Sequence, residues 1–213
     1  MQVTEIFRSI QGESTYQGLP CTFVRLTGCN LRCTWCDTEY AFHGGQKMSI
    51  DEIITAVDGL GGRLVEVTGG EPLLHKDAPK LLSRLLASGY DVMLETSGER
   101  PLDNVPPAVV KIVDVKCPDS GEANTFHLEN LGLMAGHDQL KFVVSSRRDY
   151  EFARDFTLEH RLLDRFAATI LSPVHNAVDL AQMASWILDD KLDGVRFGSQ
   201  LHKQIWGPDT PGV

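Results

Sequence analysis

Short apolar runs alternate along this chain with longer segments whose apolar residues recur at helical spacing. The runs are rich in β-branched residues and are bounded by Gly, Ser or Pro, which is typical of buried strands. They predict strands at residues 22–28, 64–70, 91–98, 109–116, 140–146, 166–173 and 194–200. The segments between them predict helices at residues 49–60, 77–89, 149–163 and 179–190. The polar segment 118–138 is expected to be a loop with at most a short helix.

Strands that alternate with helices predict βα units and a parallel sheet. A closed eight-stranded barrel takes about 250 residues, whereas this chain has 213 residues and six or seven candidate strands. We therefore expect an incomplete, open parallel α/β barrel, with residues 1–213 forming a single domain. Nearly every predicted strand ends in a polar or glycine-rich cluster. Because active sites of such folds lie at the carboxyl ends of the strands, these clusters predict one shared site.

The overall charge narrows the classes of partner. A net charge of −9 argues against a broad nucleic-acid surface, which requires positive potential. It is compatible with an anionic small molecule, because one buried Arg can bind a carboxylate locally. No apolar run approaches the ~20 residues that span a bilayer, and the first residues lack the features of a secretory signal. We expect a cytoplasmic protein that binds neither membrane nor nucleic acid directly.

Three closely spaced cysteines carry the clearest chemical signal. Cys29, Cys33 and Cys36 have the spacing C-x3-C-x2-C. Clustered cysteines in the cytosol more often bind metal or do redox work than form disulfides. Iron–sulfur clusters are normally held by four thiolates. Three thiolates on a four-iron cluster would leave one iron free for a small molecule, and the loop follows the first predicted strand, so that iron would face the predicted site.

These cysteines have two other interpretations. A structural zinc site needs a fourth ligand, which Cys21, His43 or Cys117 can supply in principle, but the chain has no second C-x2-C pair. Buried free thiols can also pack as small apolar groups. Polar neighbours of the three cysteines argue against that. The three-thiolate cluster is therefore the favoured interpretation.

The cysteine motif, with Trp35 before its last cysteine, resembles the signature of the radical S-adenosylmethionine (SAM) enzymes. This resemblance implies an incomplete α/β barrel and a [4Fe–4S] cluster whose open iron chelates SAM, which is then cleaved to a 5′-deoxyadenosyl radical. The stretch TGGEP at residues 68–72 resembles the family's motif for the methionine amino group. Glycines let backbone carbonyls approach a ligand closely, and an ammonium group needs acceptors. A simple strand-to-helix turn is the alternative for this stretch.

A narrower resemblance extends over most of the chain. EIFRSIQGEST at residues 5–15, TFVRLTGCNLRC, CDTEYAF, ETSG, DVKCPDSG and the final HKQIWG are similar to the 7-carboxy-7-deazaguanine synthases. The resemblance implies a carbon–nitrogen lyase that contracts 6-carboxy-5,6,7,8-tetrahydropterin to 7-carboxy-7-deazaguanine with loss of ammonia, in 7-deazapurine (queuosine-type) biosynthesis. It also implies Mg²⁺, an electron donor such as flavodoxin or ferredoxin, and a homodimer.

The same resemblance assigns roles to individual residues. Catalysis is assigned to the cluster ligands Cys29, Cys33 and Cys36, and Mg²⁺ to Thr38, although on charge alone Asp37 is the obvious ligand. The pterin is assigned to Ile10, Gln11, Gly12, Glu13, Arg25, Thr68 and His202. SAM and the cluster surroundings are assigned to Trp35, Asp37, Gly69, Gly70, Glu71, Ser97, Lys116, Ser172 and His175. Three of these assignments also have purely structural alternatives. Residues 11–13 can form a polar turn, Arg25 can form a structural salt bridge, and His202 can have a structural role, as a lone histidine often does.

Two functions compete with this hypothesis. A glycyl-radical activating enzyme is also small and carries a cluster, but its protein substrate would require an open cleft in place of the 10–13 loop. A zinc module or an electron-transfer iron–sulfur module needs a fourth ligand and does not explain TGGEP. Turnover of the pterin distinguishes the first alternative, and the effect of removing Cys21 and Cys117 distinguishes the second.

Overall fold

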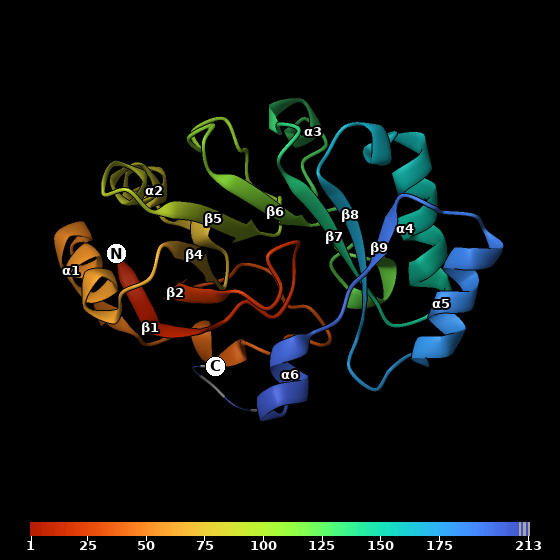
Figure 1. Cartoon of the computed structure of the whole chain (residues 1–213), viewed down its shortest axis with the longest axis horizontal. Coiled ribbons are helices and arrows are strands. Elements are labelled where there is room, and N and C mark those ends of the chain that lie inside the picture. The colour runs from red at the N-terminus through yellow and green to blue at the C-terminus, as the bar shows by residue number, and fades with distance from the viewer. Residues whose placement is uncertain (209, 211, 213) are drawn as a thin grey trace.

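A nine-stranded sheet with the order β3-β1-β2-β4-β5-β6-β7-β8-β9 forms the centre of the molecule (Figure 1). The computed structural model describes residues 1–208, 210 and 212. Neighbouring strands pair in parallel from β2 to β9 through this order, whereas β1 pairs antiparallel with both β2 and β3. The strands are β1 (Gln2–Ile10), β2 (Pro20–Leu26), β3 (Gln46–Lys47), β4 (Leu64–Gly69), β5 (Asp91–Thr96), β6 (Val110–Asp114), β7 (Gln139–Val144), β8 (Ala168–Pro173) and β9 (Val195–Phe197).

Helices follow the parallel strands, as the alternating pattern predicts. They are α1 (Ile50–Leu60), α2 (Ala78–Ala87), α3 (Asn130–Leu133), α4 (Arg147–Glu159), α5 (Leu180–Asp189) and α6 (Leu201–Trp206). Short 3₁₀ turns η1 (Glu39–Ala41), η2 (Pro72–Leu74), η3 (Pro118–Ser120) and η4 (Leu162–Asp164) lie between them. The expected capping box forms at the start of α1, where the Ser49 side chain accepts from the Glu52 backbone and Glu52 accepts in return. No helix among the described residues is long and apolar enough to cross a membrane.

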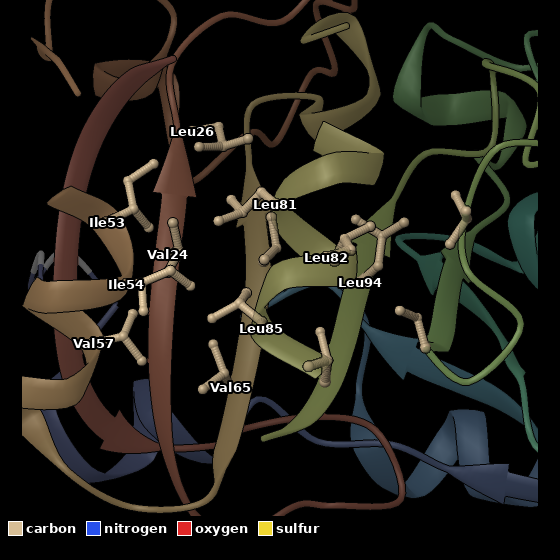
Figure 2. Packing of buried hydrophobic residues seen from close by; sticks show 14 of the residues in the cluster. Val24, Leu26, Ile53, Ile54, Val57, Val65, Leu81, Leu82, Leu85 and Leu94 are labelled. Carbon is tan, nitrogen blue, oxygen red and sulfur yellow. The ribbon is translucent and has the colours of Figure 1, made fainter. Parts of the chain in front are cut away.

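The two faces of the curved sheet differ because side chains alternate along each strand. On the outer face, apolar residues of β2, β4 and β5 pack against α1 and α2, and Figure 2 shows Val24, Val65 and Leu94 in this layer. The intervening residues of β2 and β4 point to the inner face. There Phe23 lies opposite Glu66 in the register of the two strands, and Arg25 lies opposite Thr68. The helices therefore cover the apolar face, and the inner face holds the charges.

The open barrel is confirmed, with additions that the sequence pattern did not predict. Strands β1 and β3 extend the edge of the sheet beside β2, and α6 follows β9. The helix predicted at residues 179–190 forms as α5, but only its Met183 is buried, and Leu188 is 75% exposed. Because β9 is a three-residue edge strand, α5 covers the sheet only in part. The usual helix after β2 is reduced to η1, which leaves the cysteine loop lightly covered.

Candidate active site

The carboxyl ends of the parallel strands surround an open cavity of about 1010 Å³, called the central cavity below. Nearly all residues predicted for the site line it, although they come from positions 10 to 202 of the chain. These are Ile10, Gln11, Gly12, Glu13, Arg25, Cys29, Cys33, Trp35, Cys36, Asp37, Thr38, Thr68, Gly69, Gly70, Ser97, Lys116, His175 and His202. A cavity of this size can hold two small molecules side by side, since ligand pockets typically span about 300–1000 Å³.

The three cysteines lie together on one loop at the mouth of the central cavity, half-buried and as free thiols. Burial raises the pKa of the Cys33 thiol to about 11, and the Lys116 ammonium opposes that rise. The loop is held from outside by the Thr34 hydroxyl, which donates to the Ser120 carbonyl, and by the Arg32 backbone N–H, which donates to Glu122. The thiols are thus presented to the cavity by contacts of the neighbouring residues Arg32 and Thr34, which leave the sulfur atoms accessible.

Glycines bring the end of β4 against this loop. A Cβ at Gly69 would lie 2.3 Å from the Leu26 carbonyl oxygen, and a Cβ at Gly70 would lie 2.3 Å from the Gly28 oxygen and 2.8 Å from the Cys29 Cβ. No side chain fits at either position without displacing backbone. The two glycines therefore join the TGGEP stretch to the cysteine loop, which supports a role for this stretch beyond a simple turn.

Two predicted residues, Glu71 and Ser172, do not line the central cavity. The Glu71 carboxylate is fully buried and accepts hydrogen bonds from the Thr96 hydroxyl at 2.7 Å, the Ser97 hydroxyl at 2.7 Å and the Ser97 and Leu73 backbone N–H groups. It fixes the ends of β4 and β5 relative to each other. Ser172 is buried on β8, where a Cβ on Gly198 would lie 2.2 Å from its hydroxyl. The Glu71 side chain is thus engaged within the chain, and Ser172 is 1% exposed.

The loop after β1, residues 11–19, closes one side of the cavity. The Gln11 side chain is oriented at both ends, since its Nε2 donates to Glu66 at 3.0 Å and its Oε1 accepts from the Glu13 backbone at 2.7 Å. The Gly12 carbonyl accepts from the Leu201 backbone at 2.9 Å, and a Cβ at Gly12 would lie 2.2 Å from His202 Nδ1. The loop and α6 therefore form one wall.

Arg25 lines the cavity from β2 and pairs with Glu5 on β1 through Nε at 2.7 Å. The Tyr40 hydroxyl donates to the same carboxylate oxygen at 2.8 Å. The structural salt bridge considered for Arg25 is thus present. It engages one donor only, and the Nη groups make no hydrogen bond to any described residue. A bidentate contact with a ligand carboxylate remains open to the guanidinium.

The two candidate magnesium ligands differ in how they are engaged. Asp37 pairs with Lys203 of α6 at 2.7 Å. The Thr38 hydroxyl lines the cavity, and its one polar contact within the described chain is the Cys36 sulfur at 3.7 Å. A hard hydroxyl oxygen facing a cavity fits a cation that keeps most of its waters. The donor set is therefore compatible with Mg²⁺ at Thr38.

Charged residues within the strands line the cavity floor, and the sequence motifs assign no role to four of them: Glu66 on β4, Glu95 on β5, Asp114 on β6 and Lys141 on β7. The signal was available, because a charge inside an apolar run is what singled out Arg25, and the same argument applies to each of them. Lys141 pairs with Glu13 at 2.6 Å, with Glu95 and with Asp114 at 3.6 Å.

Burial and mutual proximity shift the ionisation of these groups in opposite directions. Burial, reinforced by the nearby Glu95 carboxylate, raises the pKa of Glu66 to about 8. Burial acts the same way on Glu13, but Lys141, helped by His202 and Gln200, outweighs it and lowers the Glu13 pKa to about 2. Burial lowers the pKa of His202. At neutral pH the floor therefore combines an ionised Glu13 with a largely protonated Glu66.

The cysteine loop fits an iron–sulfur cluster better than zinc. Zinc requires ligands that converge on one ion at about 2.0–2.3 Å, and no group of three His, Cys, Asp or Glu among the described residues is placed to hold a single metal ion. A four-iron cluster binds each thiolate to a different iron, so its thiolates do not need to meet at a point. Three accessible thiols facing a large cavity match that requirement.

Known proteins resemble this chain in both sequence and fold. The sequence profile of the Radical SAM superfamily matches residues 23–115. The curated 7-carboxy-7-deazaguanine synthase of Koribacter versatilis is 56% identical, over 100% of both chains. That of Chlorobaculum tepidum is 43% identical, over 100% of this chain and 97% of the relative. A crystal structure of QueE from Escherichia coli matches with a TM-score of 0.77 at 24% identity, over 94% of each chain, which supports the fold alone.

The similarity to these two synthases extends over the full chain. The cysteine loop, TGGEP and strands β4, β5 and β6 fall within the matched superfamily segment. The chain therefore belongs to the family of the 7-carboxy-7-deazaguanine synthases, within the radical SAM superfamily.

Proposed function

We propose that this chain converts 6-carboxy-5,6,7,8-tetrahydropterin to 7-carboxy-7-deazaguanine with loss of ammonia, as a radical SAM carbon–nitrogen lyase. One observation carries the proposal: in a chain 56% identical to a curated synthase, residues 11–13, the three cysteines and residues 68–70 all line one cavity. A bound [4Fe–4S] cluster and SAM would supply the radical that abstracts hydrogen from the pterin. Cys29, Cys33 and Cys36 would hold the cluster.

The chain's own residues would bind and orient the substrate. Glu13, ionised at neutral pH, offers a carboxylate to the N–H groups of a pterin edge. Arg25 offers its unpaired Nη donors to the pterin carboxylate. Thr68 and His202 also line the cavity. Such positioning contributes directly to rate, because a correctly oriented pair of reactants avoids most of the entropic cost of reaction.

The cofactors would occupy the other side of the cavity. Gly69 and Gly70 expose backbone groups beside Cys29, where an ammonium group of SAM finds acceptors. Ser97, Lys116 and His175 line the region expected for its ribose and adenine. The Thr38 hydroxyl is proposed as a ligand of Mg²⁺, which would neutralise the substrate carboxylate and fix its position.

Further properties are carried over from the family and stay predictions. We infer a homodimer, reduction by a donor such as flavodoxin or ferredoxin, a cytoplasmic location and entry of the product into queuosine-type 7-deazapurine synthesis. The light cover over the cysteine loop supports the expectation of a partner surface, because η1 replaces the usual helix after β2.

An anaerobic turnover assay tests the proposal. The cluster is reconstituted, then SAM, Mg²⁺, a chemical reductant and 6-carboxytetrahydropterin are added, and 7-carboxy-7-deazaguanine is measured by mass. We expect product that depends on all three cysteines and on SAM. If SAM is cleaved while the pterin stays unchanged, the radical chemistry stands and the substrate assignment is wrong. If a sample with an intact, reducible cluster does neither, the enzymatic assignment fails.

A further inference from the structure

A buried lysine at the cavity floor has no part in the function proposed above. Lys141 lies on β7, is 4% exposed and lines the central cavity. Its ammonium group contacts carboxylates from three separate elements: Glu13 in the 11–19 loop, Glu95 on β5 and Asp114 on β6. A buried cation is tolerated only where partners of this kind offset its desolvation. The presence of three acidic partners for one amine is more than that requirement explains.

Lys141 connects the loop to the strands. Its contact with Glu13 joins residues 128 positions apart in the chain. Glu13 receives one further side-chain hydrogen bond, from Gln200 at 3.0 Å. Glu95 in turn accepts from the Thr68 hydroxyl at 3.3 Å. A chain of side-chain contacts through Lys141 and Glu95 therefore connects Glu13 with Thr68, two residues assigned to the substrate.

Charge at the floor explains why this connection is needed. Glu13, Glu66, Glu95 and Asp114 gather there, and Lys116 pairs with Asp114 at 2.9 Å. Among the described residues, the salt bridges made by Glu13 and Glu95 are with Lys141. Without that ammonium the two carboxylates would repel each other in a medium where repulsion is weakly screened. They would then separate, bind protons or admit water.

We propose that Lys141 is a positioning residue of this enzyme, holding the Glu13 and Glu95 carboxylates together at the cavity floor so that both can accept hydrogen bonds from N–H groups of the substrate ring. The inference rests on the proposed function for the class of substrate. It assigns Lys141 no contact with SAM or the cluster. The residue acts through its two partners, and its loss should weaken binding of the pterin while leaving SAM chemistry intact.

The test compares Lys141→Met with Lys111→Met. Lys111 is a matched control, because it is also a buried strand lysine with a carboxylate partner, Asp138, but it does not line the cavity. We measure the KM for 6-carboxytetrahydropterin and, separately, the slow cleavage of SAM in the absence of pterin. Lys141→Met should raise KM about tenfold or more, as expected for loss of oriented charged acceptors. Pterin-independent SAM cleavage should stay at the wild-type rate, and Lys111→Met should change neither.

A double-mutant cycle shows whether Lys141 acts through Glu13. If it does, Lys141→Met should raise KM far less in the Glu13→Gln background than in the wild type, because the group it positions is already altered. Lys141→Arg, which keeps the charge, should recover part of the affinity. If Lys141→Met does not fold, the double variant takes its place, since it removes an unpaired carboxylate together with the amine.

The possible outcomes distinguish failure of the Lys141 inference from failure of the proposed function. An unchanged pterin KM in folded Lys141→Met, with an active wild type, overturns the inference and leaves the proposed function standing. Equal increases of KM in Lys141→Met and Lys111→Met also overturn it, because they show a general loss of stability. Full additivity with Glu13→Gln overturns the coupling to Glu13. A wild type that cleaves SAM but never converts the pterin contradicts the proposed function, and the inference falls with it.

Discussion

Two buried lysines on neighbouring strands of the sheet have opposite surroundings. Lys111 lies near the start of β6, and its ammonium pairs with Asp138 at 3.0 Å. The same carboxylate accepts from the Lys111 backbone at 2.8 Å and from the Ala135 backbone at 2.7 Å. Lys141 lies on β7 and faces the central cavity, with three acidic partners. One amine is thus balanced by one fully satisfied carboxylate, and the other is surrounded by an excess of them.

The difference separates stability from function. A buried ion pair that is balanced and hydrogen-bonded on all sides has no capacity left for a ligand. An unbalanced group of charges beside an open volume keeps acceptors available, at a cost in folding free energy. Substitutions at the Lys111 side should therefore lower stability and spare turnover. Substitutions around the central cavity should mainly lower turnover.

The largest expected effect on activity is at the cavity mouth. Cys33→Ala removes one of three proposed cluster ligands, so cluster binding and pterin turnover should both be lost. In cluster-free protein the free energy of unfolding should change by less than about 1 kcal/mol, because the thiol is only half-buried. Iron content, turnover and urea unfolding measure the three quantities.

Removing Cys21 and Cys117 together provides the control for that change. Both thiols are buried and lie outside the cavity lining, so the double alanine variant should bind a full cluster while losing stability. Loss of the cluster in this variant would support a four-ligand site and contradict the three-thiolate assignment.

The second largest effect concerns the stability contributed by the buried Lys111–Asp138 pair. Lys111→Met leaves the Asp138 carboxylate buried without its counter-charge, and breaking such a pair typically costs about 3–5 kcal/mol. Turnover per folded molecule should match the wild type. Urea unfolding and active-site titration at low temperature measure the two. Adding Asp138→Asn should restore only part of the stability, because it removes the unpaired charge, but its single oxygen can accept from only one of the two backbone N–H groups, which donate to different carboxylate oxygens. A large loss of turnover in folded Lys111→Met would remove the contrast between the two lysines.

Local sequence signals predicted the parallel strands well. Elements that depend on long-range pairing were not predicted. The runs that became β4 and β8 are buried at every position, and the α1 capping box depends only on Ser49 and Glu52, three positions apart. Strand β1, in contrast, mixes charged and apolar residues and is stabilised mainly by its antiparallel partner β2. Its strand character depends on that pairing and not on its own composition.

The site was predictable to the extent that its residues carry motifs. The cysteine loop and TGGEP are contiguous, and their meeting in space follows from the βα order. The contact between Lys141 and Glu13 joins distant residues that share no motif, so spacing gives no sign of it. Glu71 illustrates the opposite case: its place in a motif predicts a cofactor contact, and its side chain accepts hydrogen bonds from Thr96 and Ser97. A motif identifies a position, but the face of the strand decides what the side chain does.

The smallest effect concerns pH and separates two carboxylates of the cavity floor. Glu66 has a pKa of about 8, raised first by burial and then by Glu95, against an ordinary value of 4.5. The folded protein then holds more protons than the unfolded chain between these two values, so this group makes stability fall as pH rises from about 4.5 to 8. Glu13, with its pKa lowered to about 2, contributes stability that is lost only as pH falls below 4.5.

Replacing Glu66 by Gln should therefore flatten the decline of stability in that window. Between pH 5 and 8, the free energy of unfolding of Glu66→Gln relative to wild type should rise with a slope of at most about 1.4 kcal/mol per pH unit. Gln11, Glu95, Lys141 and Glu13 face this group, and the amide keeps an acceptor for Gln11. Urea unfolding at several pH values measures the difference, with Glu13→Gln as the control that should show no such slope. A constant difference for Glu66→Gln would mean that Glu66 is ionised throughout, and the cavity floor would then carry one further negative charge beside Lys141 and Lys116.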